Sequence, residues 1–181
     1  MFTDFGKVNT MINEKVQESI NDQINAEMYS AYLYLAMEAF FQSKNLDGFA
    51  NWMRIQAKEE MTHAMKFYDY LIERGGTVTL EAINKPDAKW NSPLDAFEAA
   101  YKHEQYVTSR INDMVDLAIT ENDHATRNML QWYVDEQVEE EASAESIVEK
   151  LKMVKDAPGG MYMIDKELGQ RVFTEPADEG E

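Results

Sequence analysis

The feature that most constrains the fold of this chain is an apolar helical stripe that charged side chains interrupt. Apolar residues between Phe49 and Phe67 recur every three or four positions, a spacing that predicts one buried helix face. The same spacing places Gln56, Glu60 and His63 on that face. An ionised carboxylate in an apolar core is very costly unless it is paired, protonated or bound to a cation. The segment therefore predicts a core helix that needs a counter-charge.

Three other segments with helical periodicity carry the same kind of interruption. In chain order, the interrupting residues are Glu27, then Glu104, then Gln137 with Glu140. Each polar position in the second half of the chain follows its counterpart in the first half by 77 residues. Each also lies 15 or 18 residues from the nearest turn, at Asn45 or Asn122. At about 1.5 Å per residue, we expect all six side chains at one height of a bundle, roughly 25 Å from either end.

The periodicity predicts four long helices and a short fifth helix. Their expected ranges are about 9–41, 47–75, 93–120, 124–155 and 161–171. The first helix is expected to begin at Asn9 or Thr10 and the third at Ser92, because these side chains suit the N-cap position. On the first helix, the buried face is expected to include Ile20, Ile24, Met28, Ala31 and Leu35.

The connections between the helices predict the topology. Short turns join the first helix to the second and the third to the fourth, whereas residues 77–92 can span about 50 Å, the length of a whole helix. The second and third helices are therefore expected to run parallel. We expect an all-α fold, a four-helix bundle with one long crossover and a short C-terminal fifth helix. Residues 1–173 are expected to form a single domain, and residues 174–181 an acidic, disordered tail.

Composition excludes several classes of function. Asp and Glu number 34 against 17 Lys and Arg, which gives a net charge of −17, and no two basic residues are adjacent. Such a chain is not expected to bind nucleic acid, and its acidity suits a protein that handles cations. Without cysteine, it has no disulfide, thiolate zinc site or iron–sulfur cluster. No apolar run is long enough to span a membrane, and we expect a soluble, cytoplasmic protein.

The four carboxylates at one core height predict a metal centre. They cannot all be anions in a dry core, and no Lys or Arg lies near them on the stripes, so two divalent ions are expected to supply the charge. Carboxylates with one imidazole favour iron or a similar ion over structural zinc. Glu60 can bridge two ions, and Tyr34, on the same face as Glu27, can donate a hydrogen bond or one electron. His103 and His124 lie off the stripes and are expected at the surface.

Four segments of the sequence resemble the ferritin family, specifically the non-haem ferritins of bacteria and archaea. They are residues 25–34, residues 52–63, Glu104 and residues 131–141. The resemblance implies a ferritin-like bundle. Gln137 and Glu140 stand where the symmetrical di-iron proteins of this class carry Glu-x-x-His, a departure similar to the non-haem ferritins and unlike bacterioferritin. Met61 matches the haem-ligating position of bacterioferritins, but non-haem relatives carry Met there too, and haem is not expected.

The resemblance also implies roles for individual residues. Glu27, Glu60 and His63 would hold a first iron. Glu60 would bridge to a second iron held by Glu104 and Glu140, with Gln137 nearby. A third iron site would be formed by Glu59, Glu136, Glu139 and Glu140.

The implied activity is oxidation of Fe(II) by O₂ or H₂O₂, followed by storage of Fe(III) as an oxo-hydroxide mineral in a hollow shell. The fifth helix resembles that of shells built from 24 identical subunits. Two alternatives remain open at this point. One is a di-iron oxidase or peroxidase that stores no iron, and the other is a structural or cytokine-like bundle without chemistry.

Overall fold

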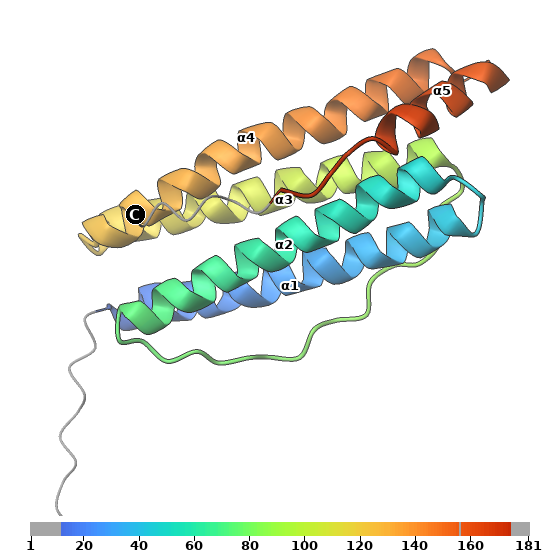
Figure 1. Ribbon diagram of the computed structural model, residues 1–181. Helices are drawn as coiled ribbons and strands as arrows, with labels where there is room; N and C mark the ends of the chain where they lie inside the picture. The colour runs from blue at the N-terminus through green and yellow to red at the C-terminus, as the bar shows by residue number, and fades with distance from the viewer. Residues whose placement is uncertain (1–11, 156, 175–181) are drawn as a thin grey trace, which may run out of the picture.

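The computed structural model describes residues 12–155 and 157–174 of the chain. Four long helices lie side by side and a short fifth helix packs at one end of them (Figure 1). In chain order they are α1 (Glu14–Gln42), α2 (Asp47–Glu73), α3 (Pro93–Thr120), α4 (His124–Met153) and α5 (Pro158–Leu168). The described residues contain no strand. The expected all-α class, with four long helices and a short fifth, is confirmed.

Local sequence explains where these helices begin and end. At the start of α3, Ser92 Oγ accepts a hydrogen bond from the Asp95 backbone N–H at 3.1 Å, and Pro93 occupies the first helical position, as predicted. The turns after α1 and α3 each use an asparagine with positive φ, Asn45 and Asn122, both at 57°. Asparagine tolerates this left-handed conformation better than most side chains do. The two turns predicted to close antiparallel hairpins are therefore built alike.

Two predicted helix starts are wrong. α1 begins at Glu14, because the Asn13 side chain accepts a hydrogen bond from the Lys15 backbone N–H and caps the helix there. The caps expected at residues 9 and 10 lie outside the described residues. α5 begins at Pro158, three residues before the predicted start, because proline fits the first turn of a helix. Of the expected acidic tail, residues 175–181 also lie outside the described part of the chain.

The connection between α2 and α3 crosses the whole length of the bundle. Residues 77–92 run along α1 from one end to the other, so α2 and α3 are parallel, as predicted (Figure 1). Asn21 holds this connection to α1, because its amide donates to the Thr77 carbonyl at 3.0 Å and its oxygen accepts from the Thr79 N–H at 2.7 Å. Asn25 donates to the Glu81 carbonyl at 3.2 Å.

The apolar core consists of two clusters that lie on either side of a polar layer. One cluster is centred on Phe41, Phe49 and Phe97, and the other on Ile20, Phe67, Ile111 and Tyr133. Leu35, expected on the buried face of α1, is instead 46% exposed, while the two residues before it are buried. The polar layer between the clusters holds the residues that interrupt the predicted stripes.

Candidate metal centre

The four long helices bring six predicted site residues into the interior of the bundle. Two come from α2, two from α4 and one each from α1 and α3; they are Glu27, Glu60, His63, Glu104, Gln137 and Glu140. Each is buried, with 7% of its surface exposed or less. Such burial of charged groups is rare unless they are paired or bind a metal.

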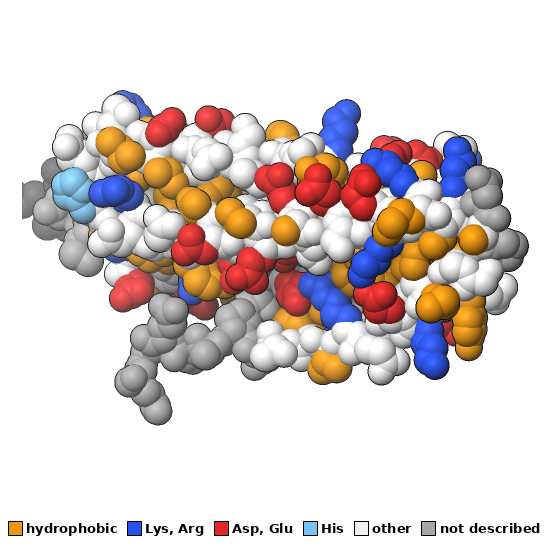
Figure 2. Space-filling view, turned by 90° about the horizontal axis from the view of Figure 1, so that it is seen from above, with side chains coloured by type: hydrophobic (Ala, Val, Ile, Leu, Met, Phe, Trp, Pro, Cys, Tyr) orange, Lys and Arg blue, Asp and Glu red, His pale blue; other side chains and the backbone are white. Residues whose placement is uncertain are grey.

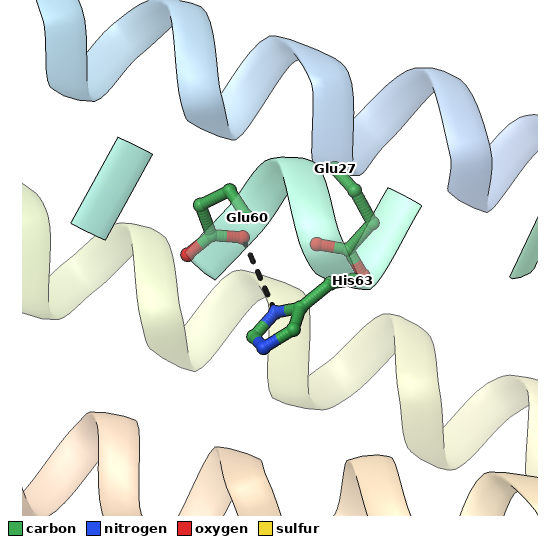
Figure 3. A group of neighbouring side chains, drawn as sticks. All are labelled: Glu27, Glu60 and His63. Carbon is green, nitrogen blue, oxygen red and sulfur yellow. Dashed lines mark ion pairs between the residues drawn. The ribbon is translucent and has the colours of Figure 1, made fainter. Parts of the chain in front are cut away.

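Glu27, Glu60 and His63 form a compact group whose ligand atoms all lie within 4.8 Å of one another (Figure 3). Glu60 Oε2 lies 3.7 Å from His63 Nδ1. Glu27 Oε1 accepts a hydrogen bond from Gln23 Nε2 at 2.8 Å. Within the described part of the chain, Glu27 Oε2 is buried and has no hydrogen-bond partner. An unpartnered buried carboxylate oxygen beside two further ligand atoms is suited to a cation.

A second group shares the same imidazole. His63, Glu136 and Glu140 also offer ligand atoms within 4.8 Å of one another, with Glu136 partly exposed. The two groups meet at His63, so carboxylates from α1, α2 and α4 surround one imidazole. Gln56 links the helices further, because its Nε2 donates to Glu140 Oε2 at 2.6 Å and to Glu60 Oε1 at 3.3 Å.

Glu104 lies in neither compact group and is engaged by neighbouring side chains. The Tyr34 hydroxyl donates a hydrogen bond to Glu104 Oε1, and Gln137 Nε2 donates to Glu104 Oε2 at 3.3 Å. Tyr34 is fully buried, as its predicted place beside the site requires.

The remaining predicted ligands are not gathered into these groups. Glu59 Oε2 accepts a hydrogen bond from Arg171 Nη2 at 2.5 Å, and its carboxylate is absent from both groups. Glu139 is exposed and is likewise absent from both. Of the four residues expected at a third iron site, only Glu136 and Glu140 belong to one of these compact groups.

Burial raises the pKa values of the central carboxyl groups. Desolvation, with a contribution from the neighbouring Glu60 charge, raises the pKa of Glu27 to about 8. Desolvation and the Glu104 charge raise the pKa of Glu140 to about 8, and desolvation raises the pKa of Glu104 to about 7. The pKa of Glu60 is also raised well above its ordinary value by desolvation. Burial therefore favours the protonated forms of these carboxyl groups, and a bound cation would favour their charged forms.

Sequence reasoning missed two parts of the site. His103, expected at the surface, is instead half-buried: its Nε2 lies 2.7 Å from Ser30 Oγ and its ring centroid 6.2 Å from that of Tyr34. Desolvation lowers the pKa of His103 to about 4. Gln23, which supports Glu27, was not singled out either. The signal available for it was a polar residue one helical turn before a core glutamate, the same spacing as Gln56 before Glu60.

Within the described ranges, every helix is too short or too polar to pass through a lipid bilayer. The arrangement of buried carboxylates and one histidine in the middle of a four-helix bundle defines a metal-binding helical bundle.

Comparison with known proteins places the chain within this class. Residues 17–154 match the ferritin-like domain. The bacterial non-heme ferritin of Bacteroides fragilis strain 638R is 46% identical over 161 residues, which cover 89% of this chain and all of that protein. That of Campylobacter jejuni is 41% identical over 156 residues, covering 86% of this chain and 93% of its own.

Solved structures agree. The open-pore ferritin of the hyperthermophilic archaeon Archaeoglobus fulgidus is 54% identical and superposes with a TM-score of 0.89, covering 90% of this chain and 99% of that one. A form of the same ferritin engineered to be closed is 55% identical, with the same TM-score and coverage. The chain therefore belongs to the ferritin family of iron-storage proteins, as its motifs predicted.

Proposed function

We propose that this chain oxidises Fe(II) at a dinuclear site inside each subunit and stores the Fe(III) product as an oxo-hydroxide mineral in a hollow shell. The observation that carries this proposal is the compact group of Glu27, Glu60 and His63, in which Glu27 Oε2 has no hydrogen-bond partner in the described chain. The buried carboxyl groups of Glu104 and Glu140 lie in the same polar layer. Two adjacent sets of oxygen and nitrogen ligands that share the Glu60 carboxylate suit two adjacent iron ions. Iron is here the substrate and the stored product.

The first iron would be held by Glu27, Glu60 and His63, which already lie within 4.8 Å of one another. Glu60 would bridge to a second iron held with Glu140 and Glu104. To reach this ion, Glu104 Oε1 would exchange its hydrogen bond from Tyr34 for a bond to metal, with Gln137 still donating to Oε2. A third site would use Glu59, Glu136, Glu139 and Glu140.

The chemistry of these residues supports oxidation. Carboxylate ligands stabilise Fe(III) relative to Fe(II), because the harder ion binds anionic oxygen more strongly. The carboxyl groups of Glu27 and Glu140, whose pKa values are raised to about 8, would release protons as Fe(II) binds. Each Fe(II) gives up one electron to O₂ or H₂O₂. The buried Tyr34 hydroxyl can supply a further electron next to Glu104.

The assembly is proposed to be a shell of identical subunits, 24 by resemblance to ferritins with a fifth helix. α5 packs against α2 through Asp165, whose carboxylate accepts hydrogen bonds from the Gly48 and Phe49 N–H groups at 2.9 and 3.1 Å. The net charge of −17 per chain would attract Fe²⁺ to the assembly.

Aerobic iron loading tests the proposal. Fe(II) is added in large excess to the metal-free protein, and the iron that co-elutes with it in size-exclusion chromatography is counted. Retention of hundreds of ions per large assembly is expected. Retention of about two ions per chain would leave the dinuclear site standing but would replace storage with an oxidase that only consumes oxidant.

A further inference from the structure

The chain that follows α5 turns back along the bundle and lies against α2 (Figure 1). Asn51 on α2 fixes this segment, residues 169–174, because its Nδ2 donates to the backbone oxygens of Leu168 at 3.3 Å and Arg171 at 3.0 Å. The guanidinium carbon of Arg171 lies 4.6 Å from the centroid of the Trp52 ring. Backbone hydrogen bonds and a cation–π contact thus hold Arg171 at one place on α2.

From this place the Arg171 guanidinium reaches two side chains that border the metal centre. Nη1 donates to Gln56 Oε1 at 2.9 Å, and Nη2 donates to Glu59 Oε2 at 2.5 Å. The Arg171 and Glu59 side chains are only 24% and 22% exposed, so solvent screens the pair weakly. Among the Lys and Arg side chains of the described residues, Arg171 is the one hydrogen bonded to a candidate iron ligand.

The charge on Glu59 acts on carboxyl groups of the metal centre, although the Glu59 carboxylate lies in neither compact ligand group. Glu59 raises the pKa of Glu140, and Glu136 in turn raises that of Glu59. On the face that carries α4 and α5, acidic side chains gather near the middle of the bundle, with basic side chains beside them toward α5 (Figure 2). A guanidinium and a divalent cation satisfy a carboxylate in the same way, by placing positive charge against its oxygens.

We infer that Arg171 is a tethered cation that occupies the Glu59 carboxylate in the metal-free protein, so that a third metal ion binds there only by displacing it. This inference rests on the proposed function, because it assumes a third ion beside the dinuclear site. Displacement of Arg171 also frees Oε1 of the Gln56 amide. The Nε2 atom of the same amide donates to Glu60 and Glu140. Binding of the third ion is therefore coupled to release of Arg171, in the segment after α5. It is also coupled to the hydrogen bonds that Gln56 donates to Glu60 and Glu140.

Calorimetric titration with Zn²⁺, a redox-inert probe, tests this competition on the assembled, metal-free, full-length protein. Arg171→Gln removes the guanidinium charge. Arg54→Gln is the matched control, since Arg54 is an arginine of α2 that pairs with Glu38, away from the centre. The first two ions are expected to bind alike in both variants. The third is expected to bind about five- to tenfold more tightly to Arg171→Gln. Equal or weaker binding of the third ion in that variant would overturn the inference.

Further variants separate competition from a merely structural role. Arg171→Lys keeps the charge and is expected to restore the wild-type affinity for the third ion. Adding Glu59→Gln to Arg171→Gln is expected to abolish the gain. If Arg171→Gln does not assemble, Asn51→Ala is used instead, because it loosens the segment and keeps the guanidinium. It is expected to raise the affinity for the third ion by a smaller factor. An unchanged third-ion affinity in Asn51→Ala would then count against the tether.

A crystal structure of the zinc-loaded wild-type protein gives the direct view. Arg171 is expected to have left Glu59 wherever a third zinc ion contacts that carboxylate, whereas zinc on Glu59 with the ion pair intact would refute the competition. The same titrations distinguish the two proposals. Failure of the first two ions to bind wild-type protein would refute the dinuclear site. Normal binding of these two without any shift of the third in Arg171→Gln would refute the present inference alone.

Discussion

The two hairpins, α1 with α2 and α3 with α4, place polar residues at the same register. They differ in how far these side chains are already hydrogen bonded within the protein. In the first hairpin, Glu27, Glu60 and His63 converge to within 4.8 Å, and Glu27 keeps a buried oxygen without a hydrogen-bond partner in the described chain. In the second, Gln137 donates to Glu104, whose other oxygen accepts from Tyr34 of α1. The first hairpin thus presents an unsatisfied ligand set, and the second a set already satisfied by the protein.

The residue types explain this difference. Histidine offers a metal a neutral nitrogen, and the amide of Gln137 offers its carboxylate neighbour an N–H donor. A metal ion entering the first hairpin replaces no hydrogen bond at Glu27 Oε2, whereas an ion that takes Glu104 must displace the Tyr34 hydroxyl. We therefore expect the first hairpin to bind its ion more tightly than the second.

The largest effect is expected from removing the residue that both halves share. Glu60→Ala takes away the proposed bridge, and the rate of Fe(II) oxidation is expected to fall by about 100-fold or more, beyond the 10- to 100-fold typical of losing a supporting residue. Stopped-flow absorbance of the Fe(III) product measures it. Asp69→Ala, an exposed carboxylate on the same helix, serves as the control and should oxidise iron at the wild-type rate. Wild-type oxidation in Glu60→Ala would exclude the centre between the two hairpins.

The two hairpins are compared directly by His63→Ala and Gln137→Ala. Loss of the imidazole is expected to lower the affinity for the most tightly bound Zn²⁺ ion by about 10- to 100-fold, because it removes a ligand from the unsatisfied set. Loss of the amide should change the affinity for that ion by no more than about threefold. It should lower only the affinity for the second ion, because Gln137 contacts Glu104 in the other hairpin. Calorimetric titration of both variants resolves the two ions. Equal weakening of the first ion in the two variants would contradict the proposed asymmetry.

The pH dependence of stability measures how strongly the central carboxyl groups resist ionisation in metal-free protein. The pKa of Glu27 and that of Glu140 are raised from 4.5 to about 8, so the folded chain keeps protons that the unfolded chain loses above pH 4.5. The free energy of unfolding therefore falls as pH rises between these values and levels off above them. For each of these carboxyl groups, the Tm of the metal-free protein should drop by about 3 °C per pH unit.

Two additions sharpen this measurement. Glu27→Gln should make the slope less steep, because it removes one of the carboxyl groups whose pKa is raised. Saturating Zn²⁺ should raise the Tm more at pH 8 than at pH 5, since the ion binds the ionised carboxylates. A metal-free Tm that rises from pH 5 to pH 8 would show that other groups dominate the titration.

The parts of the fold and site that sequence could predict depend on local periodicity. The four long helices, the crossover and the burial of the six layer residues follow from the spacing of apolar and polar positions along each segment. Periodicity did not decide which of three consecutive apolar residues, Leu33, Tyr34 and Leu35, faces outward. It left His103 off the stripe, although the neighbouring Ser30 and Tyr34 make its position half-buried.

Contacts between distant segments lay beyond the sequence for a different reason. The ion pair of Glu59 with Arg171 joins residues 112 positions apart, across the turn after α5. Its existence depends on the path of an irregular segment, which no periodicity specifies. The same holds for Arg110, whose Nε donates to Gln23 Oε1 at 2.8 Å and so orients the amide that supports Glu27.

The smallest expected effect concerns the one hydrogen bond that crosses between the hairpins at Glu104. Tyr34→Phe keeps the ring, which packs edge-on against Trp52 and His103, and removes only the hydroxyl. If this hydroxyl competes with the second ion for Glu104, the variant should bind that ion about two- to fivefold more tightly, in line with the net value of a typical hydrogen bond.

The two proposed roles of Tyr34 then separate. A hydroxyl that only competes with metal would leave the rate of iron oxidation equal or higher in Tyr34→Phe once both ions are bound. A hydroxyl that also donates an electron would give a variant that binds the second ion more tightly and yet oxidises iron more slowly, and rapid-freeze electron paramagnetic resonance of the wild type would detect the tyrosyl radical. If the second ion bound more weakly instead, the Tyr34 hydrogen bond would be orienting Glu104 for metal, and the second hairpin would be preorganised like the first.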